Sequence, residues 1–219
     1  MPLERATLLA GAPSAPSPDP VAPFTIAAEP GRVLGLVGQP GSGLTRLALG
    51  LLARPARTGM VAVVDVRGWL CPVAAWEAGI APERLVVVRC ADRSAWLRVT
   101  AALVEGFPAV YAEVPAGVSD ADLRRLGALS RARRSALVLR PIGGDLPIGV
   151  LHLRVEAGTV VWQGVDRGHG ALLRCRLTLR ASGKGARGIE RVVEMEDNGS
   201  HALRMVPGLA AAPSGHAAG

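Results

Sequence analysis

Residues 38–45 read Gly-Gln-Pro-Gly-Ser-Gly-Leu-Thr and lie between an apolar run and a helical pattern. A glycine-rich loop in that context turns backbone amides and a helix N-terminus toward one cavity, which suits a phosphate group. The spacing matches the pattern G-x-x-x-x-G-K-[ST] except at the lysine, where Leu44 stands. We therefore expect a degenerate nucleotide site, and a plain turn between strand and helix is the alternative. Its residues are Gly38, Gly41, Ser42, Gly43, Leu44 and Thr45.

The missing lysine limits what such a site can do. A lysine at this position reaches the β- and γ-phosphates, and a hydrogen bond to a charged group is worth about 1.5–3 kcal/mol. One preorganised donor to the transferred phosphoryl group is commonly worth roughly a hundredfold in rate. Thr45 still supplies a hydroxyl where Mg²⁺ would bind. We expect weak ATP and Mg²⁺ binding at most, no required cofactor and no efficient hydrolysis.

Apolar runs of strand length alternate with helical segments as far as residue 140. We predict strands at 32–37, 60–66, 85–89, 108–114 and 136–140, and helices at 44–54, 73–77, 94–105 and 119–133. Ser119, three residues before Asp122, is a capping signal for the last of these helices. The alternation is typical of a mostly parallel sheet flanked by helices.

Beyond residue 141 the pattern changes to antiparallel strands. Residues 149–155 and 159–165 flank Glu156-Ala157-Gly158, and residues 191–196 and 201–206 flank Asp197-Asn198-Gly199-Ser200. Both arrangements predict hairpins. The expected fold class is α/β, a mostly parallel sheet flanked by helices with antiparallel strands appended at its C-terminal side.

Composition divides the chain into three parts. Residues 1–22 are a proline-rich lead-in and residues 207–219 an Ala- and Gly-rich tail, both expected to be flexible, while residues 23–206 form one core domain. No run approaches the roughly 18 to 20 apolar residues that a membrane span needs. The three cysteines lack paired spacing, which fits reduced thiols. We expect a cytoplasmic protein without a membrane partner.

Three segments, 31–45, 63–67 and 81–88, resemble the RecA core: its phosphate loop, the strand bearing its catalytic glutamate, and the linker into its next strand. By this resemblance Arg67 takes the position of that glutamate, and an arginine cannot accept a proton from water. The alternative is that Arg67 is a surface loop residue. Residues 108–113 are similar to a Walker B strand, with Glu113 as the candidate Mg²⁺ contact. Where RecA carries a γ-phosphate sensor, Arg140 and Pro141 offer none.

The resemblance implies a RecA-like P-loop core without ATPase activity. The two loops that would bind DNA, at 115–118 and 142–147, are short, and the N-terminal polymerisation helix and the separate C-terminal domain of RecA have no counterpart. A trimmed, degenerate core of this kind resembles the actinobacterial ImuA-type proteins, the RecA-like accessory subunits of the mutasome.

The ImuA-type resemblance implies a role in the SOS response to DNA damage, as an accessory protein of mutagenic translesion synthesis. Its partners would be an ImuB-type Y-family-like protein and, through it, an error-prone C-family DNA polymerase and the sliding clamp. The protein would associate with the nucleoid when damage is induced. Two alternatives stay open, a weak DNA-stimulated P-loop ATPase and a SulA-like SOS inhibitor of FtsZ.

Basic residues provide candidate DNA contacts on a chain whose formal net charge is +7. Arginines alternate with apolar residues at strand period in 173–180, which places them on one face of a strand. Contacts from such a face to phosphates would give weak, sequence-independent binding. The candidates are Arg174, Arg176, Arg180, Lys184 and Arg187. The arginines of helix 119–133 fit a solvated helix face, and the histidines lack metal-ligand spacing, so no metal site is expected.

A partner surface is predicted on the C-terminal strands. The hairpin 191–206, with Arg191 and Arg204, has an edge that could pair with an incoming strand. Trp162 could anchor the interface, because large aromatic side chains dominate binding energy when they are desolvated at its centre. The alternative is that Trp162 covers the sheet.

Overall fold

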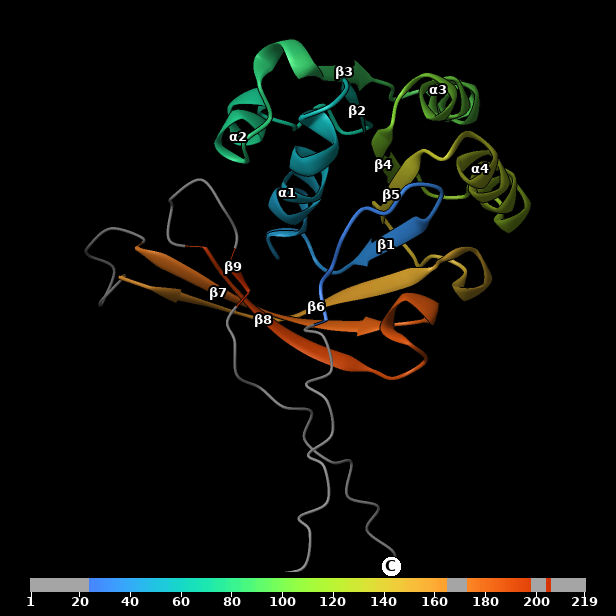
Figure 1. Ribbon diagram of the computed structural model, residues 1–219. Helices are drawn as coiled ribbons and strands as arrows, with labels where there is room; N and C mark the ends of the chain where they lie inside the picture. Colours follow the sequence, from blue (N-terminus) through green and yellow to red (C-terminus); the bar gives the residue numbers. More distant parts are fainter. Residues whose placement is uncertain (1–23, 165–172, 198–203, 206–219) are drawn as a thin grey trace, which may run out of the picture.

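The computed structural model describes residues 24–164, 173–197 and 204–205 (Figure 1). Strands and helices alternate along the first part of the chain. They are β1 (Val33–Val37), α1 (Leu44–Ala56), β2 (Val61–Asp65), α2 (Pro72–Glu77), β3 (Leu85–Arg89), α3 (Arg93–Gly106), β4 (Ala109–Val114), α4 (Asp120–Arg133) and β5 (Ala136–Pro141). The predicted alternation of strands and helices is confirmed.

The second part of the chain is built of strands. They are β6 (Leu153–Gln163), β7 (Arg174–Ser182), β8 (Arg191–Asp197) and β9 (Arg204–Met205), and the short 3-10 helices are η1 (Pro82–Arg84), η2 (Ile148–Val150) and η3 (Lys184–Ala186). The nine strands of the described residues form one mixed sheet in the order β3-β2-β4-β5-β1-β6-β7-β8-β9. Strands β1 to β6 pair in parallel, and β7, β8 and β9 pair antiparallel.

The direction of each crossover sets which helices cover which face. The connections from β1 to β2 and from β2 to β3 run toward the β3 edge, and those from β3 to β4 and from β4 to β5 run back. Because parallel crossovers are right-handed, α1 and α2 must lie on one face and α3 and α4 on the other. Figure 1 shows this division, with the C-terminal strands curling beneath α1.

Two apolar layers follow from this arrangement. The layer under α1 joins Leu47 and Leu52 of the helix to Leu177 and Leu179 of β7, so the antiparallel strands share a core with the parallel sheet. The layer under α3 and α4 contains Trp96, whose side chain is fully buried. Helix α4 begins where predicted, because the Ser119 side chain accepts a hydrogen bond from the Asp122 amide at 3.1 Å.

The first predicted hairpin is wrong. Residues 156–158 do not form a turn but continue strand β6. The first half of β6 pairs in parallel with β1, and the strand pairs antiparallel with β7 along most of its length. The register between β6 and β7 shifts between Ala157 and Val160, so the glycine marks a β-bulge. A Cβ at Gly158 would lie 3.2 Å from the Thr178 carbonyl oxygen, which explains the glycine by close approach of two strands.

The second predicted hairpin has its strands in β8 and β9, which pair antiparallel, while its turn at 198–203 lies outside the described residues. The lead-in 1–22 and the tail 207–219 also lie outside the described residues. Among the helices of the described part, none has the length and apolar character that a membrane crossing requires.

Candidate functional site

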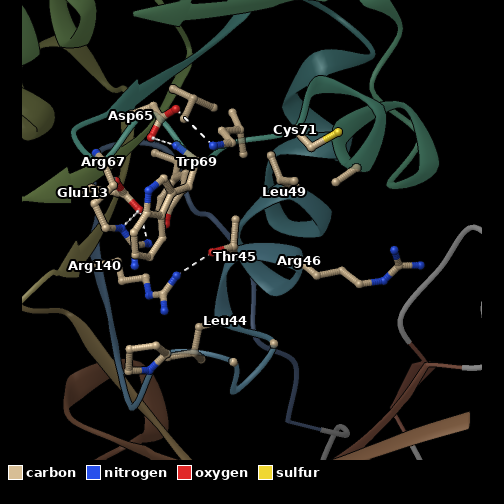
Figure 2. Close-up of a pocket in the computed structure, with 17 residues that line it drawn as sticks. Leu44, Thr45, Arg46, Leu49, Asp65, Arg67, Trp69, Cys71, Glu113 and Arg140 are labelled. Atoms are coloured by element: carbon tan, nitrogen blue, oxygen red, sulfur yellow. Dashed lines mark hydrogen bonds and ion pairs between the residues drawn. The ribbon is translucent and has the colours of Figure 1, made fainter. Parts of the chain in front are cut away.

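A pocket of about 430 Å³ opens at the carboxyl ends of the parallel strands (Figure 2). It is lined by the loop after β1, the first turns of α1, the ends of β2, β4 and β5, and the segment 67–71. In open α/β sheets this edge is where ligands bind. The predicted site residues Thr45 and Glu113 meet here with Arg67 and Arg140, although all four come from distant parts of the sequence.

The loop 38–45 connects β1 to α1, as a phosphate loop requires. Gly41 and Gly43 adopt φ angles of +82° and +75°, which glycine accommodates without strain. The Ser42 amide and hydroxyl both donate to the Gln39 carbonyl oxygen, at 3.3 and 2.7 Å. The Ser42 amide is therefore engaged within the turn. The first amides of α1, from Leu44 onward, have no intrahelical acceptor.

Leu44, at the lysine position, is fully buried and belongs to the apolar layer under α1. Its side chain packs close to Gly38, where an added Cβ would lie 3.1 Å from a Leu44 methyl carbon. The position that supplies a cation in an active P-loop therefore supplies core packing here.

Thr45 lies in the first turn of α1, and its hydroxyl accepts a hydrogen bond from Nη1 of Arg140. Arg140 comes from the end of β5 and is 6% exposed. The oxygen that would contact Mg²⁺ in an active site thus faces a guanidinium (Figure 2). A guanidinium stays charged in proteins and repels a divalent cation.

Glu113, the other candidate Mg²⁺ contact, is 4% exposed at the end of β4. Its Oε1 accepts from both Nε of Arg67, at 3.0 Å, and Nη2 of Arg67, and its Oε2 accepts from the amides of Val66 and Arg67 at 3.1 and 3.2 Å. A carboxylate offers about four acceptor sites, so this one is saturated. The hydrogen bond that Arg67 donates to Glu113 raises the pKa of Arg67 further above its ordinary value.

Three pocket residues were missed by the sequence reasoning, and two of them belong to or follow the end of β2. Asp65, at the end of β2, accepts from the amides of Gly68, Trp69 and Leu70 at 2.9, 3.2 and 3.0 Å, and so fixes the segment that carries Arg67. Trp69 lies 4.7 Å from the Arg67 guanidinium, ring centroid to carbon, a cation–π contact. An aspartate directly after an apolar strand was the available signal, because such a residue lies at the carboxyl edge of the sheet.

Tyr111 was also missed. Its side chain is 1% exposed, lines the pocket and makes no hydrogen bond of acceptable geometry through its hydroxyl. Burial raises the pKa of Tyr111, and the neighbouring Arg140 and Thr45 oppose that shift. The hydroxyl is therefore a protonated, buried polar group that faces the pocket.

The DNA-contact candidates of β7 lie on the face that points away from α1, but acidic residues of β8 share that face. Arg174 pairs with Glu196 at 3.3 Å, and Arg176 pairs with Glu196 at 3.5 Å and Glu194 at 4.0 Å. Much of the positive charge on this face is therefore compensated. Arg180 is exposed opposite Glu156 of β6, and Lys184 and Arg187 lie in and directly after η3.

The three interface candidates fall into two places on the antiparallel strands. Trp162 is 52% exposed and pairs with Cys175, next to the row in which Arg204 pairs with Glu196. Arg191 pairs with Ala181, six residues along β7 from Cys175, which is roughly 20 Å at 3.3 Å per residue. Arg204 lies in the row next to that of Trp162, and Arg191 belongs to the other end of the sheet.

Within the described residues, no group of three or more His, Cys, Asp and Glu side chains is placed to hold a metal ion. No curated protein matches the chain. The family model described as MT3502 N-terminal domain matches residues 26–147, more than half of the chain and the whole of the pocket described above. The chain belongs to the MT3502 N-terminal domain family.

Proposed function

We propose that this protein is a catalytically inactive P-loop protein of the RecA type, which acts by binding partners in damage-induced translesion synthesis. The observation that carries the inactive part of the proposal is the pairing of both candidate Mg²⁺ contacts with arginines. Thr45 faces Arg140 and Glu113 is saturated by Arg67 and two amides. With Leu44 at the lysine position, the pocket lacks both the cation and the metal contacts of an active site.

The RecA-type part is supported by the position of the loop after β1 and by the antiparallel strands at one side of a parallel sheet. The link to translesion synthesis rests on the resemblance to ImuA-type proteins. By that resemblance the partners are an ImuB-type protein and, through it, an error-prone C-family polymerase and the sliding clamp. The protein would associate with the nucleoid after DNA damage. A core retained without its catalytic groups favours a role in binding, for which Trp162 and Arg204 are the candidate contacts.

Phosphate release from ATP tests the loss of catalysis. We expect none above background with Mg²⁺, with or without DNA, for the full chain. Leu44→Lys alone should not restore it, because Arg67 still leaves the attacking water without a base. Turnover by the unmodified protein that disappears in Thr45→Ala would overturn the proposal and favour the DNA-stimulated ATPase.

Co-purification tests the partner. An ImuB-type protein should be retained by the full chain, and FtsZ should not. Trp162→Ala with Arg204→Glu should weaken retention of the ImuB-type partner, while Arg124→Glu, on the exposed face of α4, is the matched control. Retention of FtsZ instead would support the SulA-like alternative, and unchanged binding by folded double variants would place the interface elsewhere.

A further inference from the structure

Within the described residues, Arg140 is a buried cation without an ion pair. Its side chain reaches the pocket from the end of β5, and Nη1 donates to the neutral hydroxyl of Thr45 (Figure 2). A guanidinium carries five N–H donors and a charge that it does not lose. Burial of a charge is costly unless it is paired, so the missing partner of Arg140 needs an explanation.

The carboxylates around the pocket are committed to other groups. Glu113, the neighbour of Arg140 across β4 and β5, has all of its acceptor sites filled by Arg67 and two amides. Asp65 is held by three amides of its own loop. In the described part of the chain, no acidic group lies within 4.0 Å of Arg140. The counter-charge must come from outside those residues.

Other groups of the pocket can also donate to a ligand. The Tyr111 hydroxyl is buried beside Arg140 and Thr45 and makes no hydrogen bond of acceptable geometry within the described residues. The N-terminal turn of α1, a helix of 13 residues, opens into the same space. Free amides at a helix N-terminus bind phosphate oxygens, and a pocket of about 430 Å³ has the size of a small-molecule site.

We propose that this pocket binds the phosphate group of a small molecule as a free anion, without Mg²⁺, with Arg140 as the anchor. The Tyr111 hydroxyl and the first amides of α1 complete the set of donors. Arg140 thus takes the place of both the P-loop lysine and the metal. This inference deepens the proposed function at the same pocket and rests on its claim that Mg²⁺ has no ligands there.

A phosphate group fits this donor set better than a carboxylate does. The planar fork of an arginine binds two oxygens of a phosphate at once, and a third oxygen remains for the helix amides. Mg²⁺ should oppose binding, because it withdraws the free anion and is repelled by Arg140. An active P-loop has the opposite dependence, since its ligand enters with the metal.

Isothermal titration of the full chain with pyrophosphate, ATP and adenosine tests the proposal, each in EDTA and in excess Mg²⁺. We expect pyrophosphate or ATP, but not adenosine, to bind in EDTA and more weakly in Mg²⁺. Binding of ATP alone identifies a nucleotide as the source of the phosphate, and equal binding of pyrophosphate identifies the phosphate group as sufficient. The proposal is wrong if neither binds in EDTA or if binding requires Mg²⁺.

Variants locate the site. Arg140→Met should weaken binding about tenfold or more, because hydrogen bonds to charged groups carry that much. Arg140→Lys is the second variant, for use if the methionine variant fails to fold, because it keeps the positive charge. It should give an intermediate loss of affinity because lysine lacks the planar fork of arginine. Arg133→Met, on the exposed face of α4, is the matched control and should bind as the unmodified protein does.

Two further results separate this inference from the proposed function. Thr45→Val frees Nη1 of Arg140, so it should strengthen metal-free binding, whereas a metal-bridged ligand would be lost. Undiminished binding by folded Arg140→Met and Arg140→Lys would overturn the anchor role. Hydrolysis of ATP in the phosphate-release assay would overturn the proposed function, while binding in EDTA that depends on Arg140 would still support the anion site.

Discussion

Arginines occupy two regions of this molecule under opposite conditions. On the outer face of β7, Arg174 and Arg176 are partly exposed and share two glutamates of β8. In the pocket, Arg67 has a saturated glutamate and Arg140 has a neutral hydroxyl. The strand β7 is more basic in sequence, yet within the described part of the chain Arg140, a buried cation without an ion pair, lies in the pocket. The difference shows that the pairing of arginines, more than their number, indicates where an anion would bind.

The largest expected effect concerns the two glutamates that hold these arginines. Glu113→Gln should destabilise the fold by about 3–5 kcal/mol, because it leaves the Arg67 charge buried without its counter-ion. Glu196→Gln should cost less than about 1 kcal/mol, since its arginine partners are exposed to water. Urea denaturation of both variants measures the difference. Equal losses in the free energy of unfolding would show that the Arg67–Glu113 pair stabilises the fold no more than the surface ion pairs of β7 and β8 do.

The two pocket arginines should respond differently when each is replaced by methionine. Arg67→Met leaves the buried Glu113 without its counter-ion and should cost about 3 kcal/mol, the lower part of the range because two backbone amides still donate to that carboxylate. Arg140→Met removes a buried charge that has no carboxylate, so the free energy of unfolding should change by less than about 1 kcal/mol. These values apply to the protein without ligand, by urea denaturation in phosphate-free buffer. A large loss in Arg140→Met would reveal a stabilising partner for that guanidinium.

Removing the negative charges that pair with the outer arginines of β7 should increase the affinity of this face for DNA. Glu194→Gln with Glu196→Gln should strengthen binding to a DNA duplex and steepen its salt dependence by about one unit per arginine released. Fluorescence anisotropy across a salt series measures both. Glu105→Gln with Asp120→Asn changes the net charge equally on α3 and α4. An equal gain in that control would assign the effect to net charge and not to the β7 face.

The smallest expected effect concerns His152, whose partial burial makes the stability of the fold depend on pH. Burial lowers the pKa of His152 below its ordinary 6.5, and the positive charge of Arg32 adds to the shift, although Glu29 lies 3.8 Å away. The unfolded chain therefore takes up this proton at a higher pH than the folded protein does. Stability should fall as the pH drops through 6.5 toward the folded pKa, and His152→Gln should flatten this slope. Denaturant midpoints measured between pH 8 and pH 5 check the sign.

Local sequence patterns predicted much of the fold, because strand and helix periodicity reflect burial on one or two faces. The Ser119 cap and the strand–loop–helix arrangement around residues 38–45 are of this kind. The hairpin at 156–158 failed because Glu-Ala-Gly is equally compatible with a turn and with a bulge. What decides between them is the pairing of β6 with β1, more than a hundred residues earlier in the chain, and no local pattern contains it.

The site was predictable in its positions and not in its contacts. The loop spacing placed Thr45 at the start of a helix, and the RecA resemblance placed Glu113 and Arg140 at the ends of two strands, and the three meet in the pocket. The Arg140 bond to Thr45 and the saturation of Glu113 depend on side-chain geometry across three strands. Tyr111 was read as strand residue alone, because an apolar run contains no sign of where one hydroxyl points.

The position of β1 has a consequence for the order in which the chain acquires structure. This strand lies between β5 and β6, and its partners are residues 137–139 and 153–156. As a ribosome releases the chain, β1 must wait for both neighbours, with its backbone groups unpaired in the meantime. Long-range parallel pairing is slow, and exposed apolar strands invite association with other chains. Chaperone dependence during synthesis should therefore centre on the strand that precedes the pocket loop.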